Sequence, residues 1–213
     1  MERNTQNTVQ NAADEIRSMI LNGAYQPGDP VRQDALADQL GISRTPLRQA
    51  LQSLHDDGLV VLNNNKGARV AMVTPELARD LFDMRIALEP LAFDAALPLL
   101  TKLDLARAEI ALDKETPNST PAELSDLNWE FHHALYAPCQ RALLLQTVSR
   151  LNRTAALATT IGMSITAQSN ASRDEHSAML AACKRGETEG AAALLLEHLI
   201  GAKDALIHAL GAQ

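Results

Sequence analysis

Two patterns of hydrophobic and polar positions divide the chain near residue 75. Before it, short apolar runs alternate with Gly, Pro and Asn clusters, which predict short elements joined by tight turns. After it, apolar residues recur at helical spacing in six segments: 76–100, 103–115, 121–136, 141–161, 172–184 and 187–210. Thr74, followed by Pro75, suits the start of the first long helix. The pattern therefore predicts two domains, residues 1–74 and 75–213.

The first domain contains three helical patterns and then two β-rich runs. Apolar residues fall at helical spacing over 9–22 and 32–40, and the second pattern stops at Gly41. The third helix begins after Ser43. The stretch "LVVLNNNKGARVAMV", residues 59–73, has the pattern of a β-hairpin. The predicted order is helix, helix, tight turn, helix, hairpin.

The third helix has an outer face without acidic residues. Its side chains are Arg44, Thr45, Arg48, Gln49 and Gln52. A helix-turn-helix places its second helix in the DNA major groove, where arginine suits guanine edges or phosphates and Thr and Gln suit hydrogen bonds to either. This face is therefore predicted to read DNA.

The hairpin adds basic groups to the same prediction. Lys66 and Arg69 flank Gly67, where a wing could meet the sugar-phosphate backbone or the minor groove. The alternative is that exposed arginines are simply solvated, as most are. The combination of turn, cap, outer face and basic hairpin favours DNA binding.

Composition and charge limit the other possibilities. The chain has 46% hydrophobic but only 3% aromatic residues and is rich in Ala and Leu, which favours helices over an all-β fold. The net charge of −7 argues against nonspecific polyanion binding by the whole molecule, although a local cationic face remains compatible with it. No signal-peptide core or membrane-spanning apolar run is present, so we expect a cytoplasmic protein without a membrane partner. Cys139 and Cys183 stand alone and are predicted to be small buried residues.

Residues 22–60 and the segment "NKGARV" resemble the winged helix-turn-helix of the GntR family of bacterial transcription regulators. The resemblance rests on "QPGD", "LADQLGISRTPLRQAL" and "DDGLV" in register. It implies that Arg44 and Arg48 contact the operator, with Thr45 supporting them. The family usually has Glu where this sequence has Gln33 and Gln49.

Four pieces of the second domain resemble the FCD effector domain of the FadR-type branch of that family. They are residues 84–92, 128–136, 174–187 and 195–202. The implied fold is mainly α: a winged helix-turn-helix followed by an all-α antiparallel helical bundle that binds an effector and forms the homodimer.

The FCD resemblance also implies a divalent metal held by one Asp and three His. The matching positions are Asn128, His132, His176 and His198, and this donor set suits zinc or nickel. Asn128 stands where the family has Asp, and its neutral amide cancels none of the metal's positive charge. We therefore expect a site that depends on an anionic effector or on water to complete the coordination shell of the metal. One alternative is that the site holds metal poorly; another is that the histidines are only packed in the core.

By the same resemblance, Arg85 faces the ligand cavity, where its planar fork would bind a carboxylate. The alternative is a weak i to i+4 ion pair with Glu89. Arg150 and Arg153 could add a second anion contact. Residues 162–172 are predicted to be a loop that could cover the cavity, with Ser172 capping the following helix.

The sequence thus predicts a homodimeric transcription repressor that binds a roughly palindromic DNA operator and responds to a small organic acid, with no catalytic residues. The alternative is a metal-dependent hydrolase or isomerase built on the histidines, with Glu130 or Glu175 as base.

Overall fold

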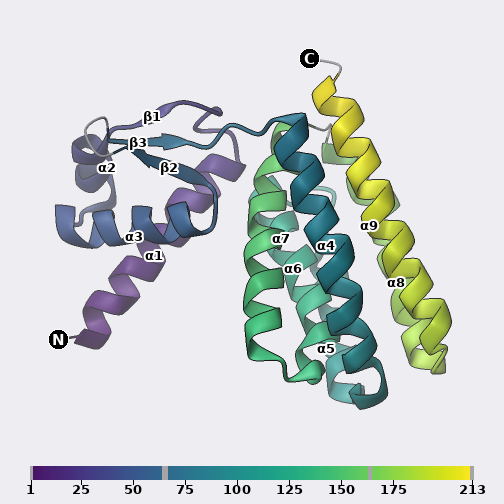
Figure 1. Ribbon diagram of the computed structural model, residues 1–213. Coiled ribbons are helices and arrows are strands. Elements are labelled where there is room, and N and C mark those ends of the chain that lie inside the picture. The colour runs from purple at the N-terminus through teal and green to yellow at the C-terminus, as the bar shows by residue number, and fades with distance from the viewer. Residues whose placement is uncertain (1, 64–66, 163–164, 212–213) are drawn as a thin grey trace. The chain divides into compact units, whose positions relative to one another are not determined.

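The computed structural model describes residues 2–63, 67–162 and 165–211, and for 2–6 and 160–171 only the backbone. It divides into two compact units, Met1–Val73 and Thr74–Gln213 (Figure 1). Helices dominate both units, so the predicted mainly α fold is confirmed.

The first unit has three helices and a small sheet. Its helices are α1 (Glu2–Leu21), α2 (Gln33–Leu40) and α3 (Arg44–Asp56). The strands β1 (Pro30–Val31), β2 (Val60–Asn63) and β3 (Gly67–Val70) form an antiparallel sheet in the order β1-β3-β2. This is the predicted winged helix-turn-helix, with β1 as an addition. A strand of two residues is too short to show a sequence period, so only its pairing with β3, Pro30 with Arg69 and Val31 with Ala68, identifies it.

The turn between α2 and α3 depends on a glycine. Gly41 has φ 63°, in the left-handed region, and the amides of Gly41 and Ile42 donate to carbonyls of the last turn of α2. Ser43 occupies the N-cap position of α3, but its side chain accepts no cap hydrogen bond. The geometry of the turn is therefore fixed mainly by the backbone.

The second unit is a helical bundle. Its helices are α4 (Pro75–Ala96), α5 (Lys102–Lys114), α6 (Pro121–Tyr136), α7 (Ala142–Gly162), α8 (Ile165–Arg185) and α9 (Thr188–Gly211). Short 3-10 turns follow α4 (Leu97–Leu99) and α6 (Ala137–Cys139). Helix α4 packs against α7 and α9, α5 against α6 and α8, and α8 against α9 (Figure 1). Thr74 caps α4 as predicted, accepting from the Leu77 amide at 3.2 Å.

The prediction of a loop over residues 162–172 is wrong. Helix α7 extends to Gly162 and α8 begins at Ile165, so most of that segment is helical. Ser172 lies inside α8 and does not cap it. The Ser, Gly and Asn content suggested a loop, but Ser and Asn are only modestly unfavourable in a helix, and Gly162 is the last residue of α7, so two long helices can accommodate them.

Candidate nucleic-acid interface and metal centre

Helix α3 presents a buried face and an exposed face. Leu47, Leu51 and Leu54 are essentially inaccessible to solvent. The five predicted reading residues are all exposed: Arg44, Thr45, Arg48, Gln49 and Gln52. The apolar spacing of the helix therefore determines which side chains can reach a partner.

Arg44 has an acidic neighbour that the helix sequence alone does not reveal. Its Nη2 lies 2.8 Å from Oδ1 of Asp34, which comes from α2. Both side chains are highly exposed, at 76% and 72%. Because exposed ion pairs contribute little free energy, this pair leaves Arg44 available to a stronger anionic partner.

The hairpin carries the other predicted DNA contacts. Gly67 and Arg69 are exposed on β3, and Arg69 Nη1 donates to the Gly28 carbonyl at 2.8 Å. Lys66 lies outside the described residues. This hydrogen bond holds Arg69 against the loop that precedes β1.

In the second unit, three helices bring the predicted histidines together. His132 comes from α6, His176 from α8 and His198 from α9, and all three are buried. Their potential ligand nitrogens all lie within 4.8 Å of one another. The Nε2 atoms of His132 and His176 are 3.1 Å apart. Two nitrogens bound to one zinc ion at about 2.1 Å are separated by roughly 3.0 to 3.4 Å, so the spacing fits a shared metal ion.

The outer nitrogens of these rings differ in their partners. His132 Nδ1 lies 3.0 Å from the Tyr136 hydroxyl, and His198 Nδ1 lies 2.7 Å from the Glu175 carboxylate. Such contacts orient metal-binding imidazoles. Among the described residues, His176 Nδ1 is buried and has no hydrogen-bond partner. A buried ring nitrogen without a hydrogen-bond partner is free to act as a metal ligand, which agrees with a metal at this cluster.

Burial and neighbouring positive charge keep two of these rings, His132 and His176, neutral. Burial lowers the pKa of His132 well below its usual value of 6.5, and the proximity of His176, His198 and Arg85 lowers it further. Burial likewise lowers the pKa of His176, with further contributions from His198 and Arg85. A neutral imidazole is the form that binds a metal ion, so no proton has to be displaced from a charged ring.

Arg85 lies in a buried polar network. Its Nε donates to Glu89 Oε1 at 2.6 Å, and its Nη2 donates to Asn152 Oδ1 at 3.2 Å. The guanidinium also lies 4.8 Å from the centre of the Phe82 ring. The i to i+4 pair with Glu89 therefore exists, but it is buried rather than a weak surface pair.

The remaining predicted residues are less constrained. Asn128, one helical turn before His132, is partly buried, as is Arg153, whereas Arg150 is exposed. The two candidate bases of the enzyme hypothesis have other partners: Glu130 pairs with Lys114 at 3.1 Å, and Glu175 contacts His198.

The sequence alone does not reveal the context of three residues in the buried polar network of Arg85. From the helical spacing, Glu89 is expected only to form a weak ion pair with Arg85, and no predicted role falls on Tyr136 or Asn152. Tyr136 follows His132 by four residues, a spacing that places both on one helix face and could have drawn attention. Asn152 is 67 positions from Arg85, so only the tertiary structure brings them together.

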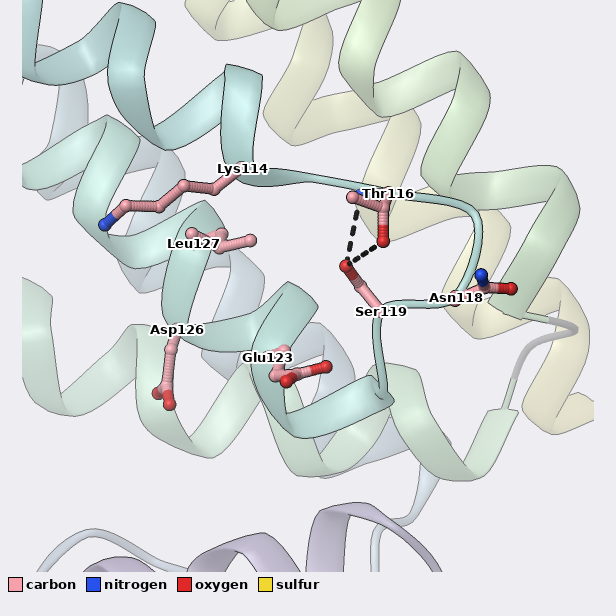
Figure 2. Close-up of a pocket in the computed structure, with 7 residues that line it drawn as sticks. All are labelled: Lys114, Thr116, Asn118, Ser119, Glu123, Asp126 and Leu127. Atoms are coloured by element: carbon pink, nitrogen blue, oxygen red, sulfur yellow. Dashed lines mark hydrogen bonds between the residues drawn. The ribbon is translucent and has the colours of Figure 1, made fainter.

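A pocket of about 420 Å³ lies at the connection between α5 and α6 (Figure 2). It is lined by Glu123, Asp126 and Leu127 of α6 and by residues of the segment 114–119. Figure 2 shows Thr116 and Ser119 joined by hydrogen bonds across the turn, both at 3.1 Å. The lining contains neither the three histidines nor Arg85, so this pocket is separate from the predicted site.

None of the described helices combines the length and the apolar character that crossing a bilayer requires.

Comparison with known proteins agrees with both units. The family profile "Bacterial regulatory proteins, gntR family" matches residues 8–70, and "FCD domain" matches residues 80–201. The chain is 30% identical over 125 residues to the uncharacterized HTH-type transcriptional regulator YdhC of Bacillus subtilis, spanning 57% of this chain but only 56% of that protein. It is 29% identical over 198 residues to the HTH-type transcriptional repressor GlaR of Escherichia coli, covering 87% of this chain and 89% of that protein.

A solved structure shares the fold. E. coli McbR/YncC superimposes with a TM-score of 0.80 at 22% identity, covering 94% of this chain and 97% of that one. Together, the two family matches, the exposed face of α3 and the helical bundle identify the chain as a DNA-binding transcription regulator of the GntR family with a C-terminal FCD domain.

Proposed function

We propose that this regulator is a homodimeric, cytoplasmic repressor controlled by a small organic acid. Residues 1–74 would bind a roughly palindromic operator. Residues 75–213 would form the dimer and bind a divalent metal and the acid. The observation that carries the effector half of the proposal is the convergence of three buried histidines from three helices.

The DNA contacts follow from exposure and chemistry. Arg44, Thr45, Arg48 and Gln49 project from the N-terminal half of α3, the part of a recognition helix that reaches base edges and phosphates. Lys66, Gly67 and Arg69 would form the wing contacts. Because the whole chain is acidic, binding depends on this local face rather than on net charge.

The proposed effector site uses the histidines and nearby arginines. His132, His176 and His198, with Asn128 as a further oxygen donor, would hold zinc or nickel. The bound ion would supply uncancelled positive charge and open coordination positions for a carboxylate. Arg85, Arg150 and Arg153 would add guanidinium contacts to the same anion.

A repressor role is supported by the similarity to GlaR of Escherichia coli, which is named as a transcriptional repressor. The acid would change DNA binding only if it binds one arrangement of the DNA-binding units more tightly than another. Residues 71–76 connect the two units along the chain and would carry this coupling.

The DNA proposal is tested by selecting genomic fragments with the purified protein and measuring their gel retardation. Arg48→Ala should weaken operator binding by at least about 10-fold, because one base or phosphate contact is lost at the centre of the reading face. Arg107→Ala removes an exposed arginine on α5 and is the matched control. Equal retardation by the wild type and Arg48→Ala would exclude α3 as the reading helix.

The effector proposal is tested by elemental analysis and a thermal-shift screen of organic acids. We expect zinc or nickel to accompany the wild-type protein and to be lost from His176→Ala. We also expect at least one carboxylate to raise the melting temperature of the metal-loaded protein. A protein that takes up neither metal nor any acid would contradict this half of the proposal and leave the DNA half intact.

A further inference from the structure

A continuous chain of buried polar groups leads from α4 to the histidines. Tyr136 Oη lies 2.9 Å from Glu89 Oε2 and 3.0 Å from His132 Nδ1. Glu89 and Tyr136, like His132, are completely inaccessible to solvent. Since buried polar groups without partners are costly, these hydrogen bonds are required contacts rather than incidental ones.

The charge of Arg85 fixes the direction of every proton in this chain. An arginine stays protonated in a protein, and Arg85 lies 2.6 Å from Glu89, so Glu89 is a carboxylate and can only accept hydrogen bonds. Asn152 Nδ2 donates to the same Oε1 atom at 3.1 Å. The Tyr136 hydroxyl must therefore donate its single proton to Oε2. Its oxygen is then left to accept a proton from His132.

The same reasoning extends to the next ring. If His132 carries its proton on Nδ1, its Nε2 has a free lone pair. The nitrogen opposite, His176 Nε2 at 3.1 Å, then donates to it in the metal-free protein. His176 Nδ1 is left as a bare nitrogen that needs no acceptor, in agreement with its lack of a partner among the described residues.

We propose that Glu89 and Tyr136 are positioning residues that hold His132 in the Nδ1-protonated form and thereby present its Nε2 lone pair to the metal. Arg85 and Asn152 act one step further out by holding the Glu89 carboxylate. The metal affinity of the site thus depends on α4 and α7 as well as on the three ligand helices. The metal part of this inference rests on the proposed function, whereas the protonation state of His132 can be tested without metal.

Nitrogen NMR of histidine-labelled, metal-stripped full-length protein tests the protonation state directly. His132→Gln assigns the ring signals. We expect Nδ1–H in the wild type. In Glu89→Gln, the side-chain oxygen should stay on Arg85 and the amide NH₂ should donate to Tyr136. The phenol would then donate to His132 Nδ1, and the ring proton should move to Nε2.

An Nε2-protonated His132 in the wild type would overturn the inference, as would an unchanged Nδ1–H ring in Glu89→Gln. A purely structural role for Glu89 does not predict the change of nitrogen. If Glu89→Gln fails to fold, Tyr136→Phe provides the same test, because it removes the acceptor of the Nδ1 proton and should release the preference for Nδ1–H.

The affinity for Zn²⁺, measured by competition with a chelator, tests the consequence. Tyr136→Phe should weaken Zn²⁺ binding about 10- to 100-fold, the usual effect of losing an outer partner of a metal-bound histidine. Leu112→Ala is the control for general destabilisation, since Leu112 is buried in the same core but on α5. It should lower the melting temperature without changing Zn²⁺ affinity.

The outcomes of the two measurements are distinguishable. Wild-type affinity in Tyr136→Phe, or an equal loss in Leu112→Ala, would overturn the positioning role. Failure of the wild type to bind Zn²⁺ or Ni²⁺ would overturn the proposed metal function, while the NMR result would still decide the protonation state of His132.

Discussion

Two arginines, one in each unit, form ion pairs of similar length in very different surroundings. Arg44 lies 2.8 Å from Asp34 with side chains 76% and 72% exposed. Arg85 lies 2.6 Å from Glu89 with side chains 6% and 0% exposed. Water screens the first pair and leaves its arginine free to exchange partners, whereas the second pair cannot separate without leaving a buried charge.

This difference suits the two arginines to different tasks. The exposed arginine can exchange its carboxylate for an external anion, such as the DNA of the proposed operator, because the exposed pair contributes little free energy. The buried arginine is suited to holding other groups in place. Its contribution to effector binding would be made together with Glu89, since the two share hydrogen bonds.

The largest expected effect is the loss of stability when the acidic partner of the buried pair is removed, compared with the same change in the exposed pair. Glu89→Ala leaves the Arg85 charge buried and the Tyr136 hydroxyl without its acceptor, so it should lower the free energy of unfolding by about 3 to 5 kcal/mol. Asp34→Ala should change it by less than about 1 kcal/mol. Urea denaturation of the metal-free proteins measures both values. Similar losses in the two variants would show that burial does not distinguish the pairs.

A smaller effect on the free energy of unfolding is expected from pH, because the second unit holds two histidines, His132 and His176, that are buried in their neutral form. The pKa values of His132 and His176 lie well below 6.5 in the folded protein and near 6.5 in the unfolded chain. As pH falls below 6.5, the unfolded chain binds protons first, so stability is lost. Between pH 7.5 and 5.5, the two rings together should lower the free energy of unfolding by about 2 to 3 kcal/mol.

Denaturation of the metal-stripped protein across this range tests the pH prediction. His176→Phe should remove about half of the loss attributed to the two rings. His208→Gln, at an exposed position of α9, should leave the loss unchanged. A His176→Phe variant with the full wild-type pH dependence would contradict the assignment.

The smallest effect is expected at the exposed pair. If Arg44 contacts the operator as proposed, Asp34→Asn removes a carboxylate that would compete with DNA for it, so operator affinity should rise by up to about 5-fold at low salt and less at high salt. Asp113→Asn is the control, because it also removes one exposed carboxylate but lies on α5 in the second unit. Weaker operator binding by Asp34→Asn alone would mean that Asp34 positions Arg44 rather than competing for it.

The sequence predicted the elements of the first unit well because their signals are local. The apolar spacing of α3 separates Leu47 and Leu51 from Arg48, and Gly41 marks the turn before it. Strand β1 is not predicted because two residues show no sequence period, and only their pairing with β3 identifies them as a strand. The loop predicted over residues 162–172 was wrong because local composition is a weaker influence than the packing of a long helix.

By itself, the sequence determined the helical periods, the two domains' order of elements and the histidines that belong to one family pattern. Only the tertiary structure decided that Arg85, Glu89 and Asn152 form one buried network, and that this network ends at His132 through Tyr136. The physical reason is range: a helical period links residues three or four apart, whereas hydrogen bonds between α4, α6 and α7 join residues about 50 to 70 positions apart, and their strength depends on burial that only the packed bundle creates.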